Sequence, residues 1–73
     1  MIADESEVAR LAGLPFKEFL KWSGYSQAKL SRRFGIPIRT VENWVAEVNT
    51  PPAHVRLMLA EILLAEKATP EHN

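Results

Sequence analysis

Apolar residues recur at intervals of three and four positions along most of the chain, and no stretch alternates apolar and polar residues as a half-buried strand would. The spacing is clearest at Phe16, Phe19 and Leu20, which would share one face of a helix. Pro15 suits the start of that helix, and Gly24 can supply the left-handed residue that closes it. The pattern therefore predicts an all-α fold class, a compact bundle of four or five helices.

Two further helices are expected on either side of this one. Residues 6–12 can form a short first helix with its apolar residues on one side. Ser26 is a good N-cap because its hydroxyl can accept a backbone N–H that has no partner within the helix. Leu30 and Phe34 would then form the buried side of a helix that ends at Gly35.

The second half of the chain predicts two more helices. A turn at residues 35–37 would be followed by another helix. The buried or half-buried face of this helix would be formed by Ile38, Val41, Trp44 and Val45. Thr50 would cap a last helix that begins at Pro51 and runs to about Lys67.

A chain of 73 residues suffices for one domain with one core. We expect an N-terminal extension at residues 1–14, a helix-turn-helix at 26–46 and a C-terminal helix at 50–67. The last helix carries more apolar residues than a single buried stripe requires, and Leu57 and Leu64 are the surplus. Surplus apolar surface on a terminal helix indicates a homodimer, with these two residues at its interface.

Charge is distributed unevenly along the chain. The formal net charge is zero, which is unusual for a small nucleic-acid-binding domain. The stretch from Ser26 to Trp44 nevertheless carries a surplus of basic residues, and the segments on either side are acidic. The basic residues of this stretch are Lys29, Arg32, Arg33 and Arg39, against Glu42 alone.

Several classes of function are disfavoured. Without cysteine there is neither a disulfide nor a thiol nucleophile, and two histidines cannot form a zinc site without carboxylates. No glycine-rich phosphate loop or acid–base arrangement is visible, so we expect no enzyme, no cofactor and no small-molecule substrate. The apolar runs are shorter than a membrane span, and the acidic start does not resemble a signal peptide. We expect a soluble cytoplasmic protein.

The middle of the chain has the residues that a helix-turn-helix requires. Two helices that meet at a steep angle need a residue such as Gly35 at the turn and a small residue such as Ser31 where their axes approach. Apolar residues on both helices would then lock the second helix against the first, leaving its other face free to enter a major groove. These residues are Leu30, Phe34, Ile36, Val41 and Trp44.

Residues 26–45 read SQAKLSRRFGIPIRTVENWV. This segment resembles the helix-turn-helix of the Cro and lambda-repressor type, the XRE family, and in particular its short single-domain bacterial members. The similarity extends over residues 15–66 and includes the Pro51–Pro52 pair before the last helix. It implies a fold of four or five helices that binds operator DNA as a dimer, and a role as a bacterial or phage repressor, antitoxin or other transcriptional regulator.

The resemblance also implies roles for individual residues. Residues 37–46 would form the recognition helix, with Ile38, Arg39, Glu42 and Asn43 facing base edges. Arg39 can bond guanine, Asn43 adenine and Ile38 a thymine methyl group, while Glu42 can accept from cytosine or orient Arg39. The phosphate contacts would come from Ser26, Gln27, Arg32, Arg33 and Thr40.

One segment departs from the family. Relatives commonly have Glu after the tryptophan, then Gly and basic residues, whereas Val45 is followed here by AEVNT. Because that loop normally contacts the DNA backbone, the absence of Lys and Arg predicts weaker phosphate binding.

Alternative interpretations remain open for parts of the sequence. Trp44 and Phe34 are expected in the core rather than as stacking platforms for bases, whereas Arg32 and Arg33 fit a solvated helix face as well as phosphate ligands. The alternative function is an interaction module that keeps the helix-turn-helix fold and binds a protein partner, as an antitoxin-like protein would. The neutral total charge and Glu47 favour this alternative.

Overall fold

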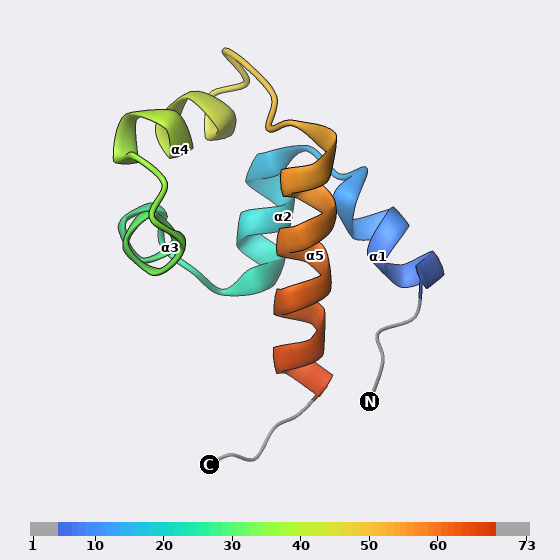
Figure 1. Ribbon diagram of the computed structural model, residues 1–73. Coiled ribbons are helices and arrows are strands. Elements are labelled where there is room, and N and C mark those ends of the chain that lie inside the picture. Colours follow the sequence, from blue (N-terminus) through green and yellow to red (C-terminus); the bar gives the residue numbers. More distant parts are fainter. Residues whose placement is uncertain (1–4, 69–73) are drawn as a thin grey trace. The chain divides into compact units, whose positions relative to one another are not determined.

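The computed structural model describes residues 5–68, and the regular structure in this range is entirely helical, with no strand (Figure 1). The prediction of an all-α fold class is confirmed. In chain order the helices of this range are α1 (Glu5–Ala12), α2 (Phe16–Ser23), α3 (Gln27–Phe34), α4 (Ile38–Val45) and α5 (Ala53–Ala68).

The contacts divide the chain into two units. One unit contains α1 and α5, which lie along each other, and the other spans Leu14–Pro51 and contains α2, α3 and α4. The predicted helix-turn-helix therefore lies entirely within the second unit.

In the first unit, α1 is fixed to α5 by apolar packing and by one polar contact. Leu11 on α1 and Leu59 and Leu63 on α5 are almost completely buried. The Arg56 guanidinium donates from Nη1 to the Ala12 carbonyl at 3.0 Å, so it satisfies an acceptor that the end of α1 leaves without a helical partner. A cation at this end also interacts favourably with the helix dipole.

In the second unit, aromatic side chains join α2 to α4. The ring of Phe16 meets that of Trp44 edge to face at 5.2 Å, and the rings of Phe16 and Phe19 are 5.9 Å apart. Leu30 on α3 and Val41 on α4 are fully buried. The prediction that Trp44 belongs to the core is confirmed, and its burial determines which side of α4 faces inward.

The ends of α2 follow the sequence prediction. Pro15 precedes the helix with φ of −53°, and Gly24 ends it in the left-handed conformation with φ of 81°. The Gly24 N–H bonds the carbonyls of Leu20 and Lys21, so the reversal of the chain closes the last helical turn.

The start of α5 differs from the prediction. Thr50 does not cap this helix and Pro51 does not begin it, because the helix starts at Ala53. The carbonyl of Pro52 accepts the first helical bonds, from the N–H groups of Val55 and Arg56 at 3.0 Å. A residue before proline is disfavoured in the α conformation, so Pro52 opposes a helical Pro51, and the helix starts two residues later than predicted.

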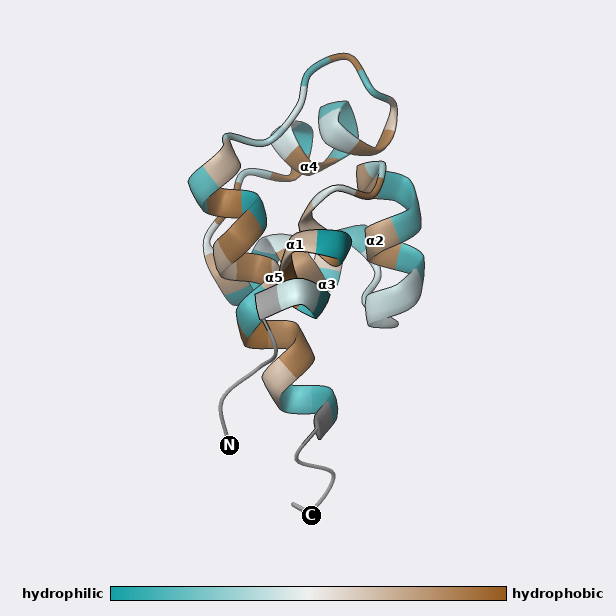
Figure 2. Ribbon diagram, turned by 90° about the vertical axis from the view of Figure 1, so that its right-hand side faces the viewer, coloured by the Kyte–Doolittle hydropathy of each residue, from teal (hydrophilic) through white to brown (hydrophobic). Residues whose placement is uncertain are grey.

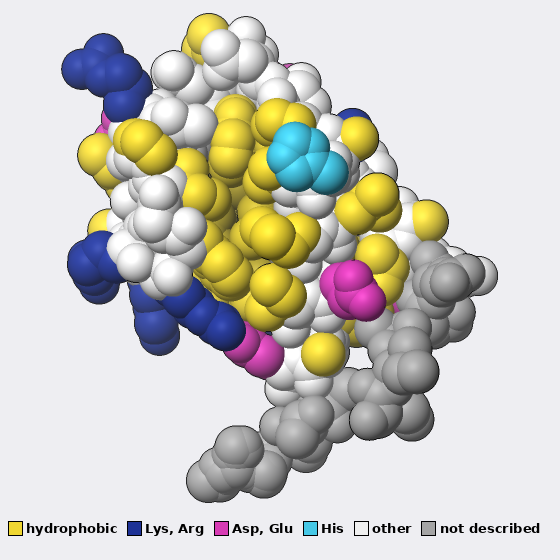
Figure 3. Space-filling view, in the orientation of Figure 1, with side chains coloured by type: hydrophobic (Ala, Val, Ile, Leu, Met, Phe, Trp, Pro, Cys, Tyr) yellow, Lys and Arg dark blue, Asp and Glu magenta, His cyan; other side chains and the backbone are white. Residues whose placement is uncertain are grey.

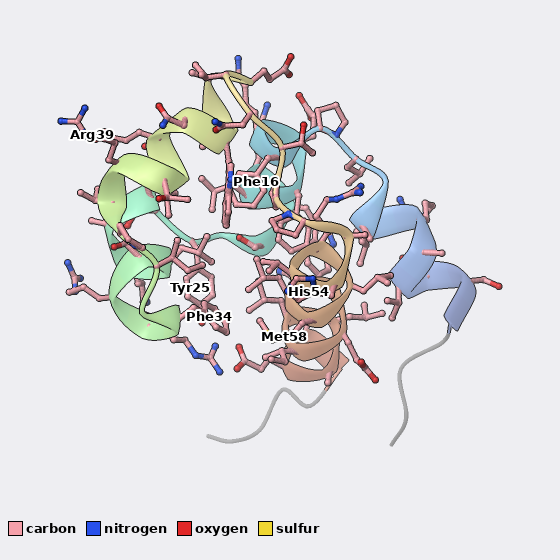
Figure 4. All side chains as sticks on the ribbon, turned by 45° about the horizontal axis from the view of Figure 1, so that its top comes forward. Phe16, Tyr25, Phe34, Arg39, His54 and Met58 are labelled. Carbon is pink, nitrogen blue, oxygen red and sulfur yellow. The ribbon has the colours of Figure 1, made fainter. Side chains whose placement is uncertain are left out.

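Part of α5 has an exposed apolar surface. Leu57 and Met58 are 46% and 44% exposed, and Leu64 is half-buried. Figure 2 shows α5 as largely hydrophobic with hydrophilic bands, and Figure 4 places Met58 and His54 on this helix. The surplus position of Leu57 is as predicted, whereas Leu64 is partly covered. Among the described helices none is both long and apolar enough to cross a membrane.

Candidate nucleic-acid interface

The turn between α3 and α4 is held by Gly35 and by two bonds between Ser31 and Ile36. Gly35 has φ of 67°, a left-handed conformation that a residue without Cβ adopts at little cost. The Ile36 N–H donates to the Ser31 carbonyl at 3.1 Å, and the Ser31 hydroxyl donates to the Ile36 carbonyl at 2.6 Å. Gly35 thus has the place at the turn that the sequence indicated. Ser31, expected as a small residue between the two helices, bonds Ile36 instead of serving through its size alone.

Both helices of the motif have defined starts. The Ser26 hydroxyl accepts the Lys29 N–H at 3.1 Å, which confirms Ser26 as the N-cap of α3. Pro37 precedes α4, and its carbonyl accepts from the N–H groups of Thr40 and Val41. The ring of Pro37 presets a backbone angle suited to a helix start, so α4 begins at Ile38 without a side-chain cap.

The two faces of α4 differ in composition. Val41 is fully buried and Trp44 is 7% exposed, while Arg39 and Glu42 on the opposite side are exposed. Ile38 is 42% exposed, so its predicted place on the inward face is wrong. It is the first residue of the helix and lies about 60° around the axis from Val41, beyond the reach of the core packing.

The four predicted base-reading residues lie on one side of α4. At 3.6 residues per turn, Ile38, Arg39, Glu42 and Asn43 fall within a sector of about 140°. Asn43 is half-buried at the edge of this sector, and the other three are exposed. Figure 4 shows the Arg39 side chain extending away from the helix.

Arg39 and Glu42 are not joined to each other. Within residues 5–68 neither a hydrogen bond nor an ion pair links their side chains. The sequence left two roles open for Glu42, a contact with cytosine or the orientation of Arg39. In the unbound chain Glu42 does not orient Arg39. The N–H donors of the Arg39 guanidinium are therefore not engaged by Glu42.

The predicted phosphate-contacting residues do not form a single cluster. Ser26 and Gln27 lie at the start of α3, with Ser26 exposed and Gln27 half-buried. Thr40 is half-buried on α4, on the side next to Asn43 rather than among the base-reading residues. Arg32 is exposed in the last turn of α3.

Arg33 belongs to a separate aromatic group. Its guanidinium donates to the Tyr25 hydroxyl and lies 4.8 Å from the centre of the Phe34 ring. The ring centroids of Tyr25 and Phe34 are 6.5 Å apart. Figure 4 labels both residues. Phe34, which was expected in the core, is thus half-buried and has the Arg33 cation over its ring.

Sequence reasoning did not single out Tyr25. The ring of Tyr25 interacts with two cations, Lys29 with Nζ at 5.5 Å and Arg33 with Cζ at 5.9 Å from its centre. The signal in the sequence is a tyrosine followed by basic residues four and eight positions later. Residues at this spacing share one side of α3, so both cations lie near the tyrosine ring. Tyr25 therefore helps to fix where these two cations lie.

The second unit is basic although the chain is neutral. Its residues 14–51 contain six Lys and Arg against three Glu, whereas the rest of the chain contains three Lys and Arg against six Asp and Glu. Figure 3 shows dark blue side chains over α3 and α4. The unit that contains the predicted helix-turn-helix thus has a net positive charge, which is the sign that attracts a polyanion.

The second residue of the loop after α4 is left-handed. Glu47 has φ of 63°, and its N–H donates to the Trp44 carbonyl at 3.2 Å. The next N–H, of Val48, donates to the Asn43 carbonyl at 2.9 Å, which completes the pair of bonds of a Schellman helix end. This conformation could not be expected from the residue types, because residues 46–50 contain no glycine.

Residues 5–68 contain no group of three His, Asp or Glu side chains placed to hold a metal ion. Comparison of the chain with models of protein families, with curated proteins and with solved structures found no match.

Proposed function

We propose that this chain binds double-stranded DNA through α4 and acts in the cytoplasm as a small transcriptional repressor of the XRE type. The observation that carries the proposal is the division of α4 into two faces. Val41 and Trp44 fix one face in the core, and Ile38, Arg39 and Glu42 are exposed on the other. A helix held in this way can enter the major groove with its outer face toward the bases.

The outer face has the chemistry to distinguish base pairs. Arg39 can donate two parallel bonds to O6 and N7 of guanine, and the Asn43 amide can pair with N6 and N7 of adenine. Ile38 offers an apolar surface to a thymine methyl group, and Glu42 can accept from N4 of cytosine. Three of these four side chains are already exposed in the unbound chain.

The start of α3 supports a contact with the DNA backbone. The first N–H groups of a helix have no acceptor within it, and the dipole makes this end attractive to an anion. Ser26 and Gln27 lie at this end, in the unit with the basic surplus. We assign them, with Arg32 and Thr40, to phosphate contacts. Arg33, which is bonded to Tyr25, would contact the DNA phosphates from its place beside the Tyr25 and Phe34 rings.

The proposal includes a homodimer. Leu57 and Met58 present apolar surface on α5, and a second copy of this helix would remove it from water. A two-fold dimer would place its two recognition helices on half-sites about one DNA turn apart. Leu64, which is half-buried, would extend the interface by one further side chain.

A second candidate function rests on the same exposed apolar side chains. Leu57 and Met58 can equally cover an apolar surface of a different protein, as in an antitoxin-like complex. This function would leave the outer face of α4 unused. It therefore predicts no effect of Arg39 on the activity of the protein.

The test is a fluorescence-anisotropy titration of duplex DNA with the natural protein and two variants. Arg39→Ala removes a proposed guanine contact, and Arg10→Ala removes the same charge from α1, where Arg10 pairs with Glu7. Loss of one bidentate contact should weaken binding to a selected site by about tenfold or more, against a small effect of Arg10→Ala. Equal binding by Arg39→Ala and the natural protein would contradict the proposal.

A further inference from the structure

The exposed face of α5 is formed by four residues in a symmetrical order. His54, Leu57, Met58 and Glu61 are exposed, and the helical period places them within a sector of about 100°. This sector lies on the side of α5 opposite to Leu63, which is buried. Along the helix axis, a histidine and a glutamate lie at the two ends of the face, about 10 Å apart, with two apolar residues between them.

The two titratable residues of this face have no partner in the part of the chain that the structure describes. Neither a hydrogen bond nor an ion pair engages the side chain of His54 or Glu61. The helix α1 packs against α5, and the charged side chains described on α1, Glu7 and Arg10, bond each other. The other charged residues of α5 lie at least about 120° around the helix from both His54 and Glu61. These are Arg56, Glu66 and Lys67.

The order of the four residues is complementary to itself. When a two-fold axis passes between Leu57 and Met58 of two antiparallel α5 helices, His54 of each copy opposes Glu61 of the other, and Leu57 opposes Met58. A parallel pair would instead bring Glu61 against Glu61 and His54 against His54, and like charges oppose association. The distribution of charge on this face therefore favours a second copy in the antiparallel orientation.

We infer that α5 associates with α5 of a second copy in the antiparallel orientation, with Leu57 and Met58 at the centre and a His54–Glu61 ion pair at each end. The inference rests on the homodimer of the proposed function and adds the face, the register and the condition under which two copies associate. Leu64, about one turn after Glu61, lies at either end of the contact.

The two ion pairs make the dimer respond to pH. Histidine is the side chain whose charge ordinarily changes between about pH 5 and 8, whereas a glutamate stays charged down to about pH 4. The ion pairs are therefore present at about pH 5.5 and lost at about pH 8, where imidazole is neutral. A single exposed pair contributes little, but a two-fold dimer has two, which together amount to about fivefold in affinity. The apolar centre contributes at both pH values.

Sedimentation equilibrium at about pH 5.5 and about pH 8 measures the effect. The natural protein should dimerise about fivefold more tightly at the lower pH. His54→Gln should remove this difference, and His72→Gln, which removes the other histidine of the chain, should keep it. Glu61→Gln should also remove the difference, whereas Glu18→Gln removes the same charge from an exposed position of α2 and should keep it.

An exchange of charges tests the register. Glu61→Lys places a cation opposite His54 and should weaken the dimer at the lower pH by about fivefold or more. Adding His54→Glu rebuilds both ion pairs in reverse and should restore the dimer at both pH values. Restoration requires that positions 54 and 61 of different copies meet. A double variant that dimerises no more tightly than Glu61→Lys alone would overturn the inference.

The outcomes separate the inference from the proposed function. A dimer that is equally tight at both pH values, and unchanged by His54→Gln, would overturn the inference and leave the homodimer intact. A natural protein that is monomeric at both pH values would refute the homodimer and the inference together, and would leave this face to a different protein. Loss of the pH difference in His72→Gln would also overturn the inference. DNA binding is measured separately through Arg39→Ala and enters none of these results.

Discussion

Ser31 and Ile36 bond each other twice across the turn between α3 and α4, once through the Ile36 N–H at 3.1 Å and once through the Ser31 hydroxyl at 2.6 Å. The first bond continues the backbone pattern of a helix end, while the second satisfies the Ile36 carbonyl in a partly buried place. Together they fix the direction in which the chain enters α4. The orientation of α4 thus depends on the side chain of Ser31.

Substitution Ser31→Ala should therefore destabilise the fold by about 1–2 kcal/mol, because it leaves the Ile36 carbonyl without its donor. Urea unfolding followed by circular dichroism measures the loss. An unchanged midpoint would show that water replaces the hydroxyl at no cost, and that this bond does not hold the turn.

The two predicted helix caps should behave differently on removal of their hydroxyl groups. Ser26→Ala removes the acceptor of the Lys29 N–H and should cost about 1 kcal/mol of stability. Thr50→Ala changes an exposed residue outside α5 and should stay within about 0.5 kcal/mol of the natural protein. Thermal unfolding of both variants provides the comparison. A larger loss for Thr50→Ala than for Ser26→Ala would contradict the observed start of α5.

The two faces of α4 predict opposite effects for neighbouring residues. Val41→Ala opens a cavity in the core and should cost about 2 kcal/mol. Glu42→Ala, on the exposed face, should change stability by less than about 0.5 kcal/mol. Denaturant unfolding of each variant measures both values. Similar losses for the two variants would place Glu42 in the core packing and remove it from the outer face.

The homodimer predicts a specific effect of Leu57. Sedimentation at tens of micromolar should show a dimer for the natural protein and a monomer for Leu57→Glu, because a buried unpaired carboxylate opposes association. Leu57→Met keeps an apolar side chain at this position and should remain dimeric. A monomeric natural protein at these concentrations would contradict the homodimer, and a dimeric Leu57→Glu would place the interface elsewhere.

Much of the fold could be predicted because local signals and tertiary packing agree. Ser26 begins a helix, and Gly24 and Gly35 end helices, where the sequence indicated. The apolar spacing located Val41 and Trp44 in the core. These features depend on the chain within a few residues of each position. A cap or an apolar stripe is visible in the sequence for this reason.

The differences arise where two local preferences compete or where distant side chains meet. Thr50 and Pro51 are residue types that often begin a helix, but Pro52 disfavours the α conformation at Pro51. Ile38 fits the apolar spacing and yet lies at the edge of the face. Glu47 is left-handed because the end of α4 requires it, although its residue type does not favour this conformation.

The candidate site is predictable in part. The spacing of Ile38, Arg39, Glu42 and Asn43 defined one side of α4, which the structure confirms as a geometric fact. Their contacts with bases stay a prediction. The bond of Arg33 to Tyr25 was missed, although basic residues four and eight positions after a tyrosine are its signal in the sequence, because it joins a residue before α3 to one in the last turn of α3.

The central claim, that DNA lies against the outer face of α4, is tested most directly by nuclear magnetic resonance. Amide spectra of the labelled protein would be recorded while duplex DNA is added at low salt. The proposed function predicts the largest shifts at Ile38, Arg39, Glu42 and Asn43, with smaller shifts at the start of α3. Shifts that avoid α4, or that are confined to α5 around Leu57, would contradict it.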